Sequence, residues 1–101
     1  MSIRLAATVA IEIAHSGTDG RMHGHSLAVE VWTSAAICLD AWRAEVAAAL
    51  EPVDGGVLED TISGRTFEAL GAAVLAALPA ARCVVVRLPS RGHVVEVCRG
   101  G

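Results

Sequence analysis

The stretch Asp19-Gly20-Arg21-Met22-His23-Gly24-His25-Ser26 places two imidazoles two residues apart, directly after a glycine-containing turn. In an extended strand, side chains alternate between the two faces and each residue rises about 3.3 Å, so His23 and His25 leave the same face about 6.5 Å apart. A third histidine, His15, ends the apolar run before the turn. Three histidine ligands with a fourth position left open are typical of catalytic zinc sites. The stretch therefore predicts a Zn²⁺ site formed by His15, His23 and His25.

The sequence on either side of the turn predicts a hairpin. Residues 3–14 alternate between an apolar face and a more polar face, and residues 25–33 do the same. His15 continues the apolar face of the first segment, and His23 and His25 continue that of the second. A single histidine in such a place is more often a hydrogen-bonded core residue than a ligand. Pairing of the two segments would bring all three histidines to one end of one layer, which favours the metal site.

The remainder of the chain predicts two helices and a second hairpin. The apolar period changes from two to 3.6 after the first hairpin, and proline or glycine residues interrupt it where we expect turns. The resulting order of strand, strand, helix, helix, strand, strand predicts one α+β domain over residues 1–101, with helices on one face of an antiparallel four-stranded sheet. The predicted bounds are a helix from Asp40, as its N-cap, to near Glu51-Pro52; a helix capped by Ser63 or Thr66 and ended by Pro79; and strands over 82–88 and 93–97.

Several patches resemble the family of 6-pyruvoyl-tetrahydropterin and 6-carboxytetrahydropterin synthases. Ile13-Ala14-His15 and the histidine stretch are similar to that family's Ala-Ala-His and Cys-x-x-x-His-Gly-His segments. Residues 53–59 keep the aspartate and the leucine of its segment before the second helix, and Arg65-Thr66-Phe67-Glu68 resembles its helix start. The resemblance implies the tunnelling fold (T-fold), zinc as cofactor, and homo-oligomers, as trimers or hexamers, that close into a barrel with sites between subunits.

Three positions depart from the pattern of that family. Asp19 stands where the resemblance places a reactive cysteine, Gly55 stands where it places a histidine, and Leu88 stands where it places a glutamate that anchors the pterin ring. Leucine cannot form the charge-assisted, bidentate pair that a carboxylate makes with a pterin. The sequence therefore predicts that the metal site is kept while the substrate has diverged.

The chemistry that we expect is a zinc-dependent lyase or cyclase reaction on a small carbonyl-containing molecule, by elimination, retro-aldol cleavage or cyclisation. Asp19, Asp54 and His93 are the candidate catalytic residues for proton transfer. Both aspartates also precede glycine, where turn geometry alone favours aspartate, and His93 near the last turn is also explained as a solvent-exposed residue. Two alternatives remain open: a non-catalytic, zinc-binding accessory or structural protein, and a true pterin-forming enzyme whose missing groups come from elsewhere.

The composition limits which binding partners and which cellular compartment we expect. The net charge of −3 and the absence of a lysine run argue against a nucleic acid or an anionic membrane as partner. Without a long apolar segment or a signal-like N-terminus, we expect a cytoplasmic protein. Cys83 and Cys98 would lie opposite each other in the second hairpin, but a reducing compartment predicts free thiols at both and at Cys38. Edge strands without lysine or internal proline predict a homo-oligomer.

Overall fold

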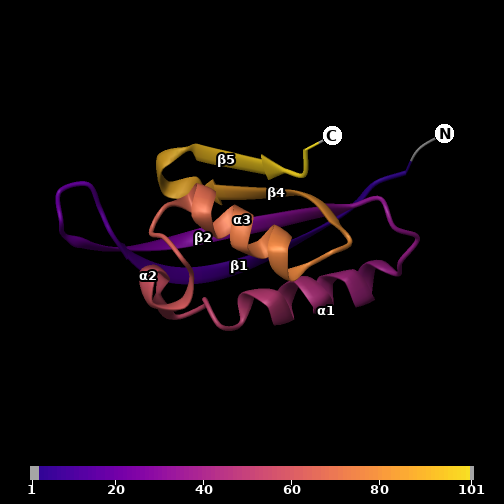
Figure 1. Cartoon of the computed structure of the whole chain (residues 1–101), viewed down its shortest axis with the longest axis horizontal. Helices are drawn as coiled ribbons and strands as arrows, with labels where there is room; N and C mark the ends of the chain where they lie inside the picture. The colour runs from indigo at the N-terminus through magenta and orange to yellow at the C-terminus, as the bar shows by residue number, and fades with distance from the viewer. Residues whose placement is uncertain (1–2, 101) are drawn as a thin grey trace.

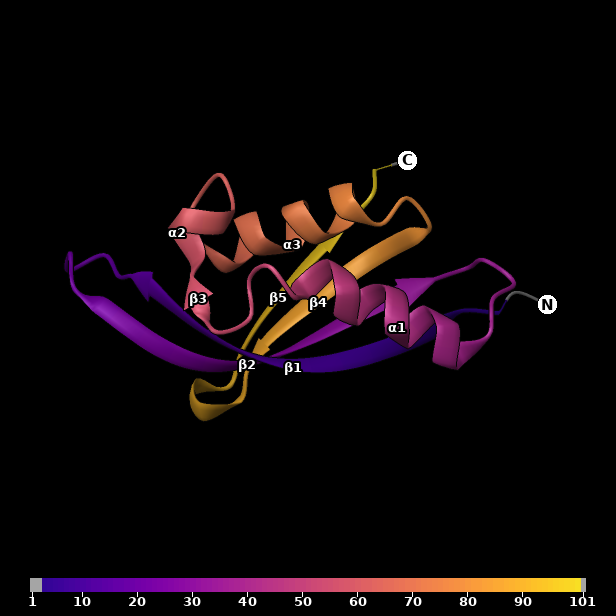
Figure 2. The ribbon, with the colours of Figure 1, turned by 90° about the horizontal axis from the view of Figure 1, so that it is seen from below.

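The computed structural model describes residues 3–100, which form one twisted sheet with helices over one of its faces (Figures 1 and 2). The strands follow the order β3-β1-β2-β4-β5 across the sheet. The predicted α+β arrangement and the order of its main elements are confirmed. The elements are β1 (Leu5–Ser16), β2 (Met22–Thr33), α1 (Leu39–Leu50), β3 (Gly56–Val57), α2 (Leu58–Thr61), α3 (Phe67–Ala77), β4 (Ala81–Leu88), the 3-10 turn η1 (Pro89–Arg91) and β5 (His93–Cys98).

The β1–β2 hairpin is the longest feature of the sheet, and its turn projects beyond the helices (Figure 1). The two strands pair in antiparallel register from Leu5 opposite Thr33 to Ser16 opposite Met22. Within this register His15 lies directly opposite His23. The strict alternation of strand side chains then puts every second residue on the helix-covered face, as the sequence predicts.

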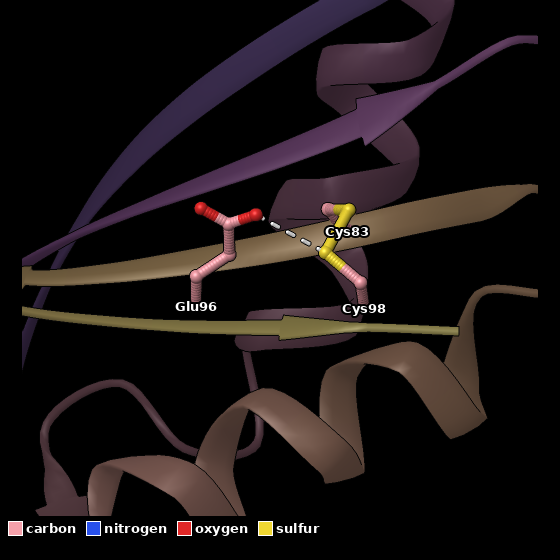
Figure 3. Close-up of side chains that lie close together, drawn as sticks. All are labelled: Cys83, Glu96 and Cys98. Atoms are coloured by element: carbon pink, nitrogen blue, oxygen red, sulfur yellow. Dashed lines mark hydrogen bonds between the residues drawn. A yellow bond between two sulfur atoms is a disulfide. The ribbon is translucent and has the colours of Figure 1, made fainter. Parts of the chain in front are cut away.

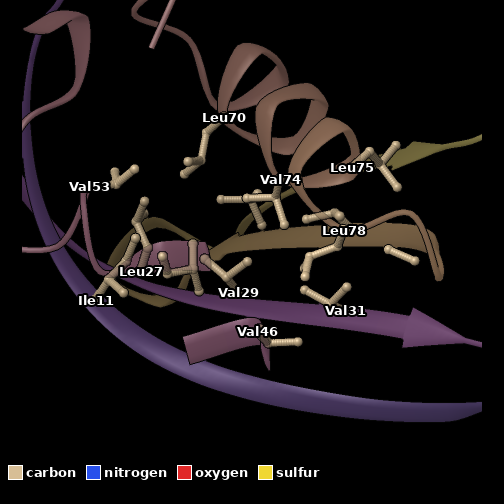
Figure 4. Close-up of a cluster of buried hydrophobic side chains, with 14 of the residues drawn as sticks. Ile11, Leu27, Val29, Val31, Val46, Val53, Leu70, Val74, Leu75 and Leu78 are labelled. Atoms are coloured by element: carbon tan, nitrogen blue, oxygen red, sulfur yellow. The ribbon is translucent and has the colours of Figure 1, made fainter. Parts of the chain in front are cut away.

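The hydrophobic core lies between this face and the helices (Figure 4). Trp42 of α1 is fully buried, and its indole Nε1 donates a hydrogen bond of 3.0 Å to the carbonyl oxygen of Val31. This bond satisfies the one polar atom of the largest core side chain. The other main core residues are Ile11, Leu27, Val29 and Val31 of the sheet, Val46 and Leu50 of α1, and Leu70, Val74 and Leu75 of α3.

The helix starts agree with the sequence at α3 and differ at α1. The Thr66 hydroxyl accepts a hydrogen bond of 3.1 Å from the backbone N–H of Ala69, so Thr66 is the N-cap of α3. At α1 the capping position is Cys38, and Asp40 lies in the first turn instead of capping it. Asp40 is still favourable there because a carboxylate complements the positive end of the helix dipole. In the part of the chain that is described, no helix is long and apolar enough to span a bilayer.

Two short elements, β3 and α2, lie between the two predicted helices, and β3 makes the sheet five-stranded where the sequence predicts four strands. β3 runs parallel to β1 and pairs with it only at Ile13 and Ala14. The Asp54 carboxylate accepts the N–H of Glu12 at 2.9 Å, and the N–H of Gly55 donates to the carbonyl oxygen of Glu12 at 2.6 Å. These two bonds attach the segment to the edge of the sheet.

The cysteines differ from the expectation of free thiols. Cys83 and Cys98 face each other in the β4–β5 pairing, with a Cα–Cα distance of 4.1 Å, and form a disulfide. The hairpin register predicted from the sequence is therefore right, whereas the prediction of thiols at these two positions is wrong. Cys38 is a free thiol, but it is exposed at the start of α1 and not buried.

Candidate metal centre

The three histidines predicted to bind metal lie together where the β1–β2 hairpin meets the start of α3. The ring centroid of His15 lies 5.0 Å from that of His25 and 6.5 Å from that of His23, and the last two rings are 6.3 Å apart. All three side chains are partly buried. Their position follows from the hairpin register, which places His15 opposite His23 and Ile13 opposite His25 on one face of the sheet.

A backbone contact orients His15. Its Nδ1 lies 2.9 Å from the carbonyl oxygen of Arg65, in the loop before α3. A carbonyl oxygen only accepts hydrogen bonds, so Nδ1 carries the proton and Nε2 keeps its lone pair. Histidines that bind metals almost always donate their second ring N–H to a carbonyl or carboxylate in this way. His15 is therefore held in the tautomer that a ligand requires.

The ring of His23 points toward the turn and contacts Asp19. Its Nε2 lies 3.1 Å from Oδ1 and 3.3 Å from Oδ2 of Asp19. Oδ1 of Asp19 also accepts the N–H of Arg21 at 2.9 Å, which is the turn-stabilising role that the sequence offered as the alternative explanation. The Arg21 N–H and the His23 ring lower the pKa of Asp19, so this carboxylate is ionised at neutral pH.

Binding of one ion by all three histidines requires their rings to approach one another further. Within residues 3–100, one set of three His, Cys, Asp or Glu side chains has ligand atoms that all lie within 4.8 Å of one another. That set is Cys83, Glu96 and Cys98, and it does not include the histidines. The histidine nitrogens are thus farther apart than this. The His23 side chain is 39% exposed, so its ring can turn about χ1 and χ2 toward the other two, and the donor set of three imidazoles on one face fits zinc.

The histidines line a cleft of about 510 Å³. Phe67, the first residue of α3, stacks on His15 at 5.2 Å between ring centroids and meets His25 edge-on at 6.0 Å. Arg91 of η1 and His93 of β5 reach the cleft from the second hairpin. The remaining lining residues are Gly17, Thr18, Asp19 and Leu88.

The cleft lining combines one arginine, Arg91, with histidines and apolar side chains. Burial lowers the pKa of His25, and the nearby His15 and Arg91 lower it further, which favours the neutral ring. Of the residues that line the cleft, Asp19 carries the only carboxylate. Leu88 is 2% exposed and presents an apolar surface where the resemblance would place an acid.

The structure brings together five of the six predicted site residues and leaves Asp54 outside the cleft. Asp19 and His93 line it with the three histidines, whereas the Asp54 carboxylate is bonded to the backbone of Glu12. A catalytic role for Asp54 stays a prediction from sequence. The cleft also contains Phe67 and Arg91, which the sequence did not indicate as site residues. Phe67 follows the capping threonine, which was the one available signal.

A further acidic residue supports the end of β1. The Glu59 carboxylate of α2 accepts the backbone N–H of Ser16 at 3.2 and 3.0 Å. This bond lowers the pKa of Glu59. Because Ser16 follows His15, the contact ties the histidine end of β1 to α2.

Comparison with known proteins shows which solved structure has a similar fold. No family model matches the sequence, and no curated protein matches it either. Among solved structures, the chain is similar to 6-pyruvoyl tetrahydropterin synthase of Caenorhabditis elegans, with a TM-score of 0.77, over 97% of this chain and 96% of the other. The two sequences are 12% identical. The resemblance noted from the histidine stretch is thus supported by the structure, and the chain has the fold of that synthase.

Proposed function

We propose that the protein is a zinc-dependent enzyme that acts on a small carbonyl-containing molecule by elimination, retro-aldol cleavage or cyclisation. The observation that carries the proposal is the convergence of His15, His23 and His25 at one cleft, with His15 fixed by the Arg65 carbonyl. The similarity in fold to a pterin synthase supports a reaction of this class. The three histidines would hold the ion, which when bound polarises a carbonyl or hydroxyl oxygen and so eases proton removal at the neighbouring carbon.

The residues around the histidines supply binding and proton transfer. Asp19 is ionised and next to His23, so it can accept a proton and return it within the cleft. It is a weak base, because it is exposed and its pKa is lowered, and His93 is the second candidate for the same role. Phe67 adds an apolar surface next to His15 and His25. Arg91 can pair with substrate oxygens that carry negative charge.

The substrate differs from a pterin in this proposal. Recognition of a pterin by charge-assisted hydrogen bonds requires a buried carboxylate facing the ring, and Leu88 occupies that place. The cleft lining combines the apolar Leu88 with the cationic Arg91, which suits a molecule with an apolar portion and an oxygen-rich end. Incubation of the zinc-loaded protein with a panel of small hydroxy-carbonyl compounds, with product detection by mass spectrometry, tests this. Turnover of a dihydropterin in preference to all of them would contradict it.

A second candidate function is a structural zinc site, and the contact between Asp19 and His23 favours it. A fourth protein ligand closes a zinc site, whereas an open position marks a catalytic one. The visible spectrum of the Co²⁺-substituted protein separates the two. Under the enzyme proposal, an added exogenous ligand such as azide changes the spectrum, and Asp19→Asn keeps the metal. Loss of metal from Asp19→Asn together with no response to azide supports the structural site.

We also propose that the protein is a homo-oligomer, as trimers or hexamers. β3 covers β1 only at Ile13 and Ala14, and β5 forms the opposite edge, so both edges of the sheet carry backbone groups that can pair with another copy. Pairing of edges between copies would close the sheets into a barrel. Light scattering at micromolar concentration should give a mass of at least three chains, and a monomer would contradict the proposal.

A further inference from the structure

Two cysteines and a glutamate form a second cluster on the face of the sheet that the helices leave uncovered. Cys83 of β4 lies directly opposite Cys98 of β5, and Glu96 lies two residues before Cys98, so all three point to this face (Figure 3). Oε1 of Glu96 is 3.2 Å from Sγ of Cys98. One ligand atom from each residue lies within 4.8 Å of the other two. This is the spacing at which three ligands can share one cation.

We propose that reduction of the Cys83–Cys98 disulfide converts this cluster into a binding site for a thiophilic divalent cation of the Zn²⁺ class. Two thiolates select soft or borderline cations, and one carboxylate completes a set of three protein ligands. In the oxidised protein both sulfurs are bonded to each other and neither is a thiolate. The disulfide therefore decides whether the site exists.

The conversion is a two-electron reduction, for which a dithiol is one suitable reductant and a phosphine, which becomes its oxide, is another. One thiolate of the dithiol attacks Sγ of one cysteine and displaces the other as a thiolate, and the second thiol of the reductant then resolves the mixed disulfide. Two electrons pass to the protein, the reductant becomes a disulfide, and Cys83 and Cys98 become thiols with two protons. Binding of the cation then releases those two protons as both sulfurs become thiolate ligands.

The hairpin keeps its register without the disulfide because other contacts hold its end. The N–H of Arg99 donates to the carbonyl oxygen of Arg82 at 3.0 Å, just beyond the two cysteines. The Arg99 guanidinium also donates to the carbonyl oxygens of Ala81 at 2.7 Å and Leu78 at 2.9 Å, which attaches β5 to β4 and to the end of α3. Reduction thus leaves the backbone of the three residues in register, and the two sulfurs then move apart by side-chain rotation until both can bind one cation.

The cluster is accessible and separate from the histidine cleft. Glu96 and Cys98 are exposed, and Cys83 is half-buried. The histidines lie on the helix-covered face of the sheet, so the two sites are on opposite faces. Pairing of β5 with another copy would use backbone groups in the plane of the sheet, and would leave this face open.

Cadmium is a suitable probe, because cadmium–thiolate bonds absorb in the ultraviolet. The background variant carries Cys38→Ser together with His23→Ala and His25→Ala, which removes the free thiol and the histidine site. Removal of Cys38 matters because the N–H groups of Ala41 and Asp40 lower the pKa of its thiol. The protein is titrated with Cd²⁺ before and after reduction by a water-soluble phosphine, and far-ultraviolet circular dichroism checks its fold in both states.

We expect the reduced protein to bind one Cd²⁺ per chain with thiolate absorption, and the oxidised protein to show no such absorption. Glu96→Gln should weaken binding about tenfold or more, as expected when a ligand or its close partner is lost. Glu30→Gln is the matched control, since Glu30 lies on the same face but outside the cluster, and its affinity should stay unchanged. Equal affinity of Glu96→Gln and the background protein, absence of thiolate absorption after reduction, or loss of the strand signal on reduction would each overturn the proposal.

Discussion

Replacement of Phe67 by alanine should weaken zinc binding without removing any ligand. The Phe67 ring stacks on His15 and meets His25 edge-on, so it fixes two of the three proposed ligands at once. An aromatic pair of this kind contributes about 0.5–1.5 kcal/mol beyond its buried area, so two pairs contribute about 1–3 kcal/mol. At about 1.4 kcal/mol for each tenfold change, this corresponds to a loss of affinity of about 5- to 150-fold. Groups that orient ligands in other metal sites have effects of about 10- to 100-fold, which agrees with this range.

The assay is competition for Zn²⁺ with a chromophoric chelator, alongside urea unfolding of each variant. Phe67→Leu keeps an apolar side chain but loses the aromatic contacts, so its affinity should fall between the wild type and Phe67→Ala. Ile62→Ala is the matched control, because Ile62 packs against the same core but does not line the cleft. It should lower stability and leave zinc affinity unchanged. If Phe67→Ala binds zinc as tightly as the wild type while losing as much stability as Ile62→Ala, Phe67 only fills the core and the reasoning is refuted.

Three further predictions concern the supports of the site and the fold. The pKa of Glu59 is lowered from 4.5 in the folded protein, so its contact with Ser16 stabilises the fold above that pH, and this stabilisation is lost as the pH falls through the lowered pKa. The free energies of urea unfolding of Glu59→Gln and of the wild type should therefore differ most above pH 4.5 and converge in stronger acid. A difference that stays constant with pH would contradict this. Trp42→Phe should lower the free energy of unfolding by about 1–3 kcal/mol, because the smaller ring leaves a void in the core and cannot donate the hydrogen bond to the Val31 carbonyl. A change too small to measure in denaturant titration would argue against this packing and bond. Once a substrate is found, Asp19→Asn should lower kcat by about 10²- to 10⁴-fold with oligomeric state intact; unchanged turnover would leave Asp19 as a turn residue and move the search to His93 or Asp54.

The position of the histidines could be predicted because strand periodicity is strict. A period of two fixes the face of His15, His23 and His25 once the hairpin is assigned, and no later packing can change it without slipping the register. The same argument predicted that Cys83 and Cys98 lie opposite each other. Their oxidation state depends on chemistry outside the chain, and there the prediction failed.

The walls of the cleft could not be predicted, since they come from segments that are brought together only by tertiary packing. Phe67 reaches the histidines from the start of α3, and Arg91 reaches them from η1. The hydrogen bond of the Asp54 carboxylate could not be predicted either, because its donor is the backbone N–H of Glu12, 42 residues away in the sequence. β3 was missed for the same reason: two residues carry no periodic signal, and the pairing exists only because the loop is attached to β1.

The metal content of the purified protein tests the central claim most directly. Zinc should be present at about one ion per chain, held by His15, His23 and His25, and the His23→Ala/His25→Ala double variant should lose it while keeping the circular dichroism of the wild type. Both histidines lie at the start of β2, outside the hydrophobic core, so their removal should leave the fold intact. A double variant that retains full zinc stoichiometry would contradict the histidine site, and with it the proposed function.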